Sequence, residues 1–432
     1  MRLNLFLRPA CAALPAGPHA ASSLLALLAL IALIALIALG AFTALAAFFP
    51  IAAAAAPYTP ASDAEVVERL PGRASDPALR RVESLRKQLA ARPDDAALRV
   101  EIARRYFDMA MAQGDPRYVG YASAAIAPLA QSGSANPGYW MVRGLIQQFS
   151  HDFEAALTSL AQASALDAAS PEPLLWRAAI FMVQARYAEA LAACDRLAPL
   201  AEPLLGTGCR AYAQAAAGQL GQAFQNLESA VKTAQAKPQT PPELLLWQYT
   251  RLAEMALRLK QGELAESYFK NAFKLGITDQ FLLGAYADFL LAQQRPAEVL
   301  KLLAGWERSD VLLLRLALAG RAASDPRARD WTAQLRDRFQ AAAQRGDRLH
   351  EQEAARFELD LQANAARAAE LASQNYQIQK EPRDAEILMR AALAAGKSKA
   401  AQPALDWLRT SRYEDPALEK LAVQLAQQGA TR

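Results

Sequence analysis

Histidine and cysteine would be the most informative residues for chemistry, and the chain contains only three of each. His151 lies in Ser150-His-Asp-Phe153, which offers a hydroxyl, an imidazole and a carboxylate in a row. Side chains of successive residues point in different directions, so this run does not make a nucleophile with its base. We interpret it as a polar turn between two helices. His350 begins a polar helical stretch, and His19 lies in the N-terminal segment.

Sequence patterns for metal, phosphate or glycoside chemistry are also absent from the 432 residues. The chain has no His-Glu-x-x-His, no Cys-x-x-Cys and neither of the common glycine-rich phosphate loops. The acid pairs Glu351/Glu353 and Glu358/Asp360 are spaced by two and face apart on a helix, which indicates solvated surface. We therefore predict no catalytic residue, no metal site, no cofactor and no enzyme activity.

Charge and composition exclude two further classes of protein. Apolar residues make up 53% and charged residues 21%, which is typical of a folded chain and not of a disordered one. The 47 basic and 43 acidic residues leave a net charge of +4. No run of Lys or Arg is longer than a pair, whereas a nucleic-acid binder needs a concentrated basic face.

The first 75 residues predict a membrane segment and a linker. No charged residue occurs from Pro9 to Ser62, and Leu24–Phe49 is almost wholly apolar. A helix of that length would span about 39 Å, enough for a hydrocarbon core of about 30 Å. Arg2 and Arg8 precede it, which favours a cytoplasmic segment 1–23, a signal anchor at 24–49 and an exported chain after a linker at 50–75. A cleaved signal peptide, leaving a soluble periplasmic protein, is the alternative.

Beyond the linker, small residues recur with a spacing close to 34. A small residue in each of two consecutive helices lets their backbones approach, and apolar residues four and seven places later would pack on the next pair. Such hairpins must stack, because one alone cannot bury its apolar face. The spacing is seen in the pairs Gly144/Ala178, Ala156/Ala190, Ala190/Ala223, Ala253/Ala287 and Ala265/Val299.

This pattern resembles the tetratricopeptide repeat (TPR) family. The set Trp140, Gly144, Ala156, Leu160 and Ala163 carries the resemblance, which extends over residues 137–305, with a divergent unit at 94–131. It implies an all-α, right-handed solenoid of stacked hairpins, preceded here by the transmembrane helix. We predict repeats at 76–308 and more divergent helical repeats at 309–432. The layout is also similar to bacterial membrane-anchored TPR proteins, which implies no activity.

In that family the first helix of each hairpin lines a concave groove that holds a partner. The resemblance therefore implies a groove of mixed apolar and polar character that would take an envelope protein or a peptide segment. The chain lacks the repeated Lys and Asn with which some members of the family bind a C-terminal carboxylate. The implied groove residues are Met141, Leu145, Gln148, Phe149, Met182, Tyr212, Trp247, Thr250, Glu254, Arg258, Phe281 and Asp288.

Cys194 and Cys209 lie fifteen residues apart, at the end of one hairpin and the start of the next. In an exported chain they would meet an oxidising compartment, so a disulfide is one interpretation. Two small buried apolar side chains are the other.

These observations predict a bacterial inner-membrane protein, single-pass, with its repeats in the periplasm. Its predicted work is to hold partner proteins or peptide segments during assembly or maintenance of an envelope complex. The alternative is an envelope enzyme or small-ligand-binding protein with its site in the irregular C-terminal third.

Overall fold

The computed structural model describes residues 62, 76–113, 115–130, 135–237 and 239–430. The predicted anchor at 24–49 lies outside these residues, as do residues 1–23 and most of the linker. Within the described ranges, no helix combines the length and apolarity needed to cross a membrane. The chain divides into Met1–Pro71 and Gly72–Arg432, and the second unit is described below.

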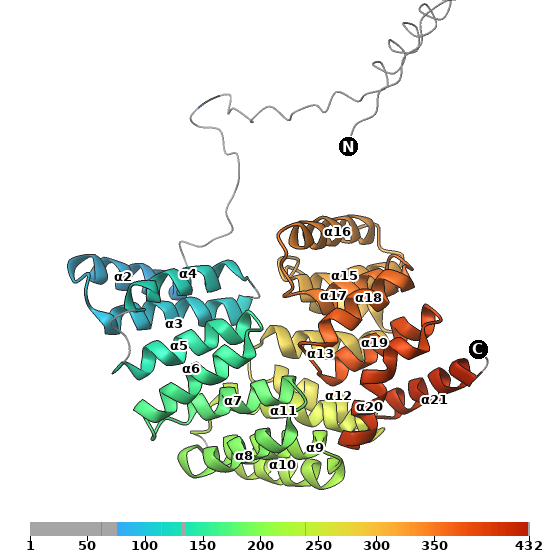
Figure 1. The fold of residues 1–432 in the computed structure, drawn as a ribbon, viewed down its shortest axis with the longest axis horizontal. Helices are drawn as coiled ribbons and strands as arrows, with labels where there is room; N and C mark the ends of the chain where they lie inside the picture. Colours follow the sequence, from blue (N-terminus) through green and yellow to red (C-terminus); the bar gives the residue numbers. More distant parts are fainter. Residues whose placement is uncertain (1–61, 63–75, 114, 131–134, 238, 431–432) are drawn as a thin grey trace, which may run out of the picture. The chain divides into compact units, whose positions relative to one another are not determined.

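Helices and short turns make up the whole of the described second unit, which contains no strand (Figure 1). Helix α2 (Pro77–Ala91) comes first and is followed by antiparallel hairpins. The first six hairpins are α3 (Ala96–Gln113) with α4 (Arg117–Ile126), α5 (Pro137–Phe149) with α6 (Phe153–Leu166), α7 (Glu172–Val183) with α8 (Tyr187–Leu197), α9 (Pro203–Ala216) with α10 (Leu220–Gln235), α11 (Pro242–Arg258) with α12 (Gly262–Phe273), and α13 (Gln280–Ala292) with α14 (Pro296–Leu302).

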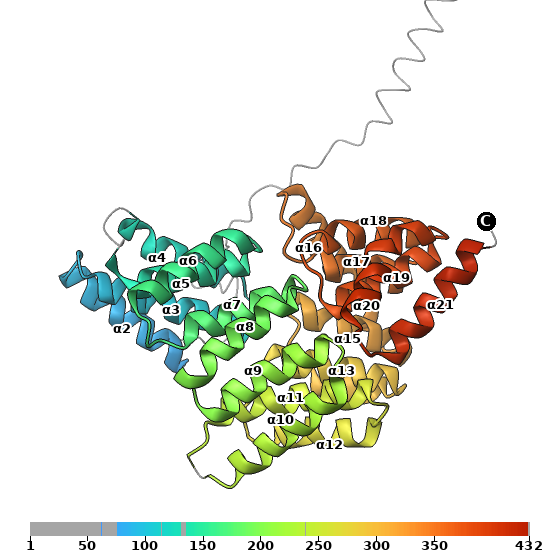
Figure 2. The same cartoon turned by 60° about the horizontal axis from the view of Figure 1, so that its bottom comes forward.

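The hairpin pattern continues to the end of the described chain. The later elements are α15 (Asp310–Ala322) with α16 (Ala328–Gln344), α17 (Glu351–Asp360) with α18 (Ala365–Tyr376), and α19 (Pro382–Ala394) with η5 (Ser398–Ala401), α20 (Gln402–Ser411) and α21 (Pro416–Ala430). Short 3₁₀ turns, η2 (Ala127–Leu129) and η4 (Ala198–Leu200), extend α4 and α8. The colours in Figure 2 follow the hairpins in sequence order along the stack.

One turn recurs between the two helices of successive hairpins. The second residue after the first helix adopts a left-handed conformation, and the amide that follows it donates to the carbonyl five residues earlier, which is the Schellman arrangement. Only one of the early examples, Gly218, is a glycine. The left-handed residues of this turn are His151, Ala185, Gly218, Lys260, Gln294, Ser324 and Gly396. Because Ser324 and Gly396 lie beyond residue 309, two of the C-terminal turns, after α15 and after α19, repeat the earlier geometry.

The small residues at the 34-residue spacing are where the paired helices meet. Ala156, Ala190, Ala223, Ala265 and Val299 in the second helices are all 0% exposed. A Cβ added to Gly144 in α5 would lie 2.8 Å from Cγ of Leu160 in α6. These positions therefore set the distance between the helices of each hairpin.

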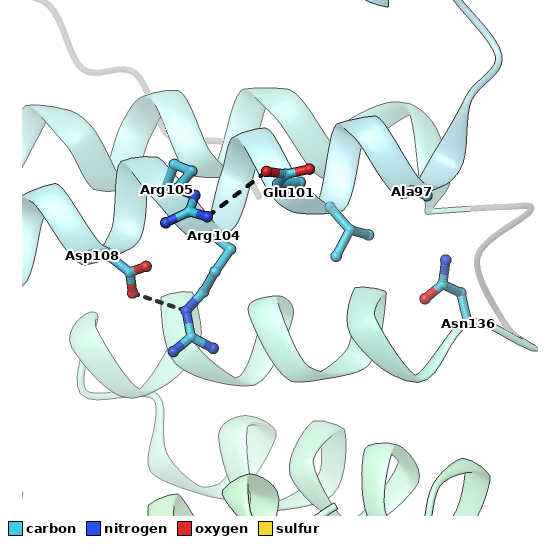
Figure 3. Close-up of a pocket in the computed structure, with 7 residues that line it drawn as sticks. Ala97, Glu101, Arg104, Arg105, Asp108 and Asn136 are labelled. Atoms are coloured by element: carbon cyan, nitrogen blue, oxygen red, sulfur yellow. Dashed lines mark hydrogen bonds and ion pairs between the residues drawn. The ribbon is translucent and has the colours of Figure 1, made fainter. Parts of the chain in front are cut away.

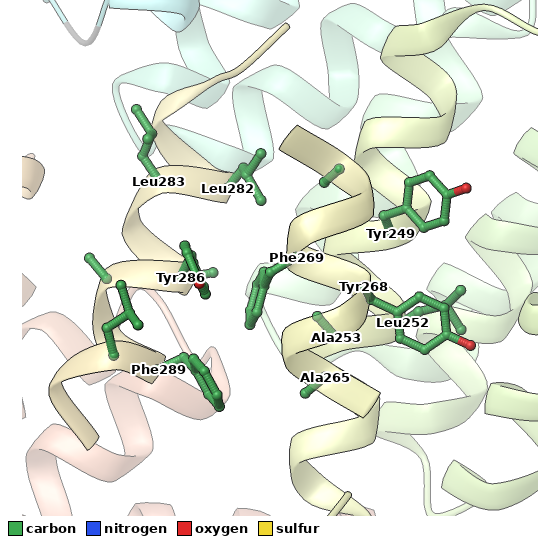
Figure 4. Close-up of a cluster of buried hydrophobic side chains, with 14 of the residues drawn as sticks. Tyr249, Leu252, Ala253, Ala265, Tyr268, Phe269, Leu282, Leu283, Tyr286 and Phe289 are labelled. Carbon is green, nitrogen blue, oxygen red and sulfur yellow. The ribbon is translucent and has the colours of Figure 1, made fainter. Parts of the chain in front are cut away.

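Apolar side chains from consecutive hairpins form the core between the helices. Figure 4 shows Phe269 projecting from α12 towards Tyr286 of α13, and the two ring centroids are 5.2 Å apart. The cluster to which it belongs extends from Leu204 to Phe357 and so crosses residue 308 without a break.

Helices far apart in sequence also contact one another. Gln280, at the start of α13, donates from Nε2 to the carbonyl of Met111 in α3 at 3.4 Å. A further apolar cluster joins Tyr187 and Ala216 of α8 and α9 to residues of α17–α21. The C-terminal hairpins therefore pack against the face of the stack where the partner groove was expected.

Candidate functional site

Three of the predicted groove residues belong to the core, and the prediction was wrong for them. Met141 is 7% exposed, Leu145 0% and Thr250 6%. They lie on the side of α5 and α11 that packs against neighbouring helices. Thr250 uses its hydroxyl within α11, donating to the carbonyl of Leu246 at 2.9 Å.

Four other predicted residues keep part of their surface. Gln148 and Phe149 of α5 and Trp247 of α11 are half-buried, and the Phe149 ring stands edge-on to Phe107 at 6.5 Å. Phe281, at the start of α13, is 60% exposed and is one of the most exposed large apolar side chains in the described chain.

Met182, Tyr212 and Arg258 lie on first helices, as predicted, but the chain itself covers them. Together with Tyr187 and Ala216 they meet the C-terminal residues Glu381, Pro382 and Tyr413, and only about 20 Å³ of enclosed space remains between them. We call this contact the seam. Burial raises the pKa of Tyr212 to about 12, so its hydroxyl stays neutral.

Arg258 connects the two sides of the seam. Its Nη2 donates to the carbonyl of Ala215 at 2.6 Å, and its Nε donates to the carbonyl of Glu414 at 2.9 Å. The guanidinium carbon lies 3.7 Å from the ring centroid of Tyr413. The carboxylate of Glu414 accepts from the amide of Leu220, the first residue of α10, at 2.7 Å. We call the seating of Tyr413 and Glu414 on Arg258 and Leu220 the clasp.

Other hydrogen bonds fasten the segment between α18 and α19, which leads into the seam, to α7 and to the turn after α5. The amide of Lys380 donates to the carbonyl of Val183 at 2.7 Å. The His151 ring lies 3.1 Å, Nε2 to Nε2, from the Gln379 amide and stacks on Phe153. The ring of His151 therefore serves the turn and the seam, in agreement with its interpretation as a turn residue.

Burial lowers the pKa of His151, and His350 nearby adds to the shift. His350 itself caps α17, and its Nδ1 lies 3.8 Å from the Glu353 carboxylate. The interpretation of this stretch as solvated was wrong, because Glu351 and Glu353 each expose only 12% of their side chains.

A second group of charges lies where α13, α15, α17 and α19 meet. Asp288 accepts from Nη2 of Arg315 at 2.5 Å and from Nη1 of Arg356 at 2.8 Å, and Arg383 lies 3.8 Å away. Burial alone would raise the pKa of Asp288, but the three guanidinium groups hold it well below its ordinary range. Asp288 is thus an ion-pair centre within the chain, and the prediction that it lines an open groove was wrong.

Glu254 is likewise occupied by the chain's own residues. It accepts from Arg251 at 2.9 Å, and the guanidinium of Arg251 lies 3.7 Å from the ring centroid of Tyr212.

Arg315, which no pattern singled out, is 1% exposed. Its position inside the apolar run Val311–Leu318 was the available signal, because an isolated charge in a buried helix needs a buried partner.

A shallow hollow lies on α3, at the other end of the stack (Figure 3). Arg104 there pairs with Asp108 at 2.8 Å and with Glu172 at 2.6 Å, while Glu101 pairs with Arg81 at 3.1 Å. The charges of the hollow neutralise one another, so it shows no preference for a charged ligand.

Cys194 in α8 and Cys209 in α9 are joined by a disulfide, with Cα atoms 5.5 Å apart. It ties one hairpin to the next, and both residues are buried in the same core cluster. Among the described residues, no three His, Cys, Asp or Glu side chains are grouped so that they could hold a metal ion.

Stacked helix hairpins, a recurrent Schellman turn and buried small residues at the hairpin contact define an α-solenoid of the TPR type. Its candidate site is the face formed by the first helices of the hairpins α5–α13, part of which holds the C-terminal helices of the same chain.

No family model matches the sequence, and no curated protein matches it. Among solved structures, the chain is similar to PilW, described as a type IV pilus biogenesis factor, with 21% identity over 57% of this chain and 94% of that one, at a TM-score of 0.35. It is also similar to a Rap protein complexed with competence and sporulation factor, with 12% identity, coverage of 81% and 94%, and a TM-score of 0.43. The TPR domain of P58(IPK) gives 13% identity, coverage of 82% and 98%, and a TM-score of 0.21. Likenesses of this degree carry no argument about activity or partner.

Proposed function

We propose that the protein is a membrane-anchored scaffold of the bacterial envelope that binds partner proteins through the concave face of its helical stack. The carrying observation is that this face already holds a polypeptide segment remote in sequence. The Arg258 side chain of α11 stacks on Tyr413 and donates to the carbonyl of Glu414, and the backbone amide of Leu220 in α10 donates to the Glu414 carboxylate.

The proposed location has two supports. The apolar stretch 24–49 follows Arg2 and Arg8 and precedes a long stretch without basic residues, as expected for an N-terminus that stays in the cytoplasm. The disulfide between Cys194 and Cys209 suits an oxidising compartment such as the periplasm. We propose that the repeats are periplasmic and that residues 24–49 retain the chain at the inner membrane.

Location is tested separately from binding. Alkaline phosphatase fused after Arg432 folds only outside the cytoplasm, because it needs its own disulfides. We expect an active fusion protein that sediments with membranes at full length. An inactive fusion would contradict the periplasmic location, and an active, soluble and shortened one would favour the cleaved signal peptide.

Partner binding is tested by crosslinking in native membranes, with capture through a C-terminal tag and identification by mass spectrometry. Phe281→Ala removes an exposed aromatic side chain of a first helix, whereas Leu166→Ala removes an exposed aliphatic side chain from the end of α6, a second helix. We expect a defined envelope protein that is lost with Phe281→Ala and retained with Leu166→Ala. Equal recovery with both variants would contradict binding at the concave face.

A further inference from the structure

The clasp shows the chemistry that the concave face of α9–α11 selects. Tyr413 is 9% exposed and lies against Arg258, whose guanidinium covers its ring at 3.7 Å. Such a contact favours an aromatic ring over an aliphatic side chain, because the negative face of the ring attracts the cation.

The residue after the aromatic one is fixed by charge and by its backbone. The carboxylate of Glu414 reaches the amide of Leu220, where the N-terminal end of α10 favours a negative group. The carbonyl of Glu414 accepts from Arg258, which is itself held by the carbonyl of Ala215. An arginine that is held in place before its ligand arrives loses less freedom on binding.

The two residues held in the clasp lie in the last interhelical turn of the described chain. Tyr413 and Glu414 lie between α20 and α21, the final helices of the described chain. Helical units of a stack can open locally, so α20 and α21 can separate from α8–α11 while the other hairpins stay folded. Arg412, just before the clasp, adopts a left-handed conformation at φ 55°. This conformation is strained for a residue that carries a Cβ.

We propose that the site formed by Arg258, Tyr212 and the start of α10 binds partner segments in which an aromatic residue is followed by an acidic one. Tyr413 and Glu414 are then the resident occupant, which a partner segment displaces as the last hairpin opens. This inference rests on the proposed scaffold function and specifies which segments the scaffold takes.

The test uses the full chain in detergent and a fluorescent peptide with the sequence of residues 409–419. In the double variant Tyr413→Ala/Glu414→Gln the site is vacated, and we expect the peptide to bind at least tenfold more tightly than to the wild type. Adding Arg258→Ala should abolish this gain. A peptide carrying Y413A and E414Q should bind the double variant at least tenfold more weakly than the unchanged peptide does. The control is Glu419→Gln in the chain, at an exposed position of α21, which should leave the peptide affinity of the wild type unchanged.

Equal peptide affinity for the wild type, the double variant and the triple variant would overturn the proposal. Hydrogen exchange of the wild type provides a measurement without variants. Excess peptide should speed exchange in α20 and α21 while the Leu220 amide stays protected, and unchanged exchange in α20 and α21 at saturating peptide would also overturn it. If the peptide test fails while capture still depends on Phe281, only the motif is wrong. If the peptide binds but no envelope protein is captured, the scaffold function is wrong.

Discussion

The indole N–H of Trp407 donates to the hydroxyl of Tyr187 at 2.9 Å, although 220 residues separate them. Both side chains are buried, at 8% exposure each. The contact joins α20 to α8 and so connects the last helices of the described chain to the third hairpin. Burial raises the pKa of Tyr187, so the hydroxyl remains neutral and available as an acceptor.

We expect Tyr187→Phe to lower the free energy of unfolding by about 1–3 kcal/mol, because the Trp407 indole N–H then remains buried without a partner. Replacing both residues by phenylalanine removes the donor as well. In a urea double-mutant cycle the two changes should therefore be clearly non-additive. Tyr121→Phe, at a position 54% exposed, is the matched control and should have almost no effect. Additive losses would show that the hydrogen bond contributes nothing of its own.

Asp288→Asn should be among the most destabilising single polar changes. It leaves Arg315, which is 1% exposed, without its carboxylate, and breaking a buried ion pair costs about 3–5 kcal/mol. Asp406→Asn is the control, because its ion pair with Arg409 is largely exposed and should contribute little. Chemical denaturation of the two variants measures the difference, and similar midpoints would contradict the assigned role of Asp288.

The local architecture was predictable from sequence because it depends on contacts between near neighbours. Small residues 34 positions apart fix how closely paired helices approach, and Ala156 and Ala190 are fully buried as that reasoning requires. Beyond residue 308, where we predicted further helical repeats, the chain continues as helix pairs that begin with α15 and α16.

The state of the groove was not predictable by the same reasoning. The clasp joins Arg258 to Glu414, and contacts across 156 residues leave no period in the sequence. We predicted that first-helix side chains line an accessible groove, because a repeat pattern describes one unit and its neighbours. It does not describe a later unit that packs against the same face. Asp288 was chosen for its place in the repeat, and its three arginine partners lie on three other helices.

The disulfide gives a prediction about oxidation. Peptide mapping of protein prepared from membranes, after alkylation under denaturing conditions, should find residues 194 and 209 linked and only Cys11 alkylated if residue 11 is retained. Replacing both cysteines by alanine should lower the free energy of unfolding by about 3 kcal/mol, the value for a closed loop of this length. Reduction of the wild type should lower its stability similarly. Two alkylated thiols at 194 and 209 would contradict the bond.

Gly218 and Gly346 are a matched pair for testing the clasp. Both have a positive φ, at 80° and 69°, so alanine carries a comparable backbone cost of about 1–2 kcal/mol at either position. A Cβ at Gly218 would also lie 2.7 Å from Cβ of Arg412, whereas nothing lies within 4 Å at Gly346. We therefore expect Gly218→Ala to cost more stability than Gly346→Ala and to speed hydrogen exchange in α20 and α21. Equal costs, with unchanged exchange, would mean that this turn and the clasp are independent.

His151 gives the seam a dependence on pH. Burial and His350 lower its pKa, so the unfolded chain takes up a proton near the ordinary pKa of about 6.5 and the folded chain takes it up only at a lower pH. The neutral His151 ring therefore contributes to the free energy of unfolding at neutral pH. This contribution decreases as the pH falls, by at most about 1.4 kcal/mol per pH unit. His151→Asn tolerates the left-handed turn and keeps a partner for Gln379, but it does not titrate. Between pH 7 and 5 the wild type should lose more stability than this variant in parallel denaturation series. His350, whose pKa is raised beside Glu353, has the opposite effect on stability as the pH falls, and it is present in both proteins. If the free energy of unfolding fell equally with pH in both proteins, the pH dependence would not come from His151.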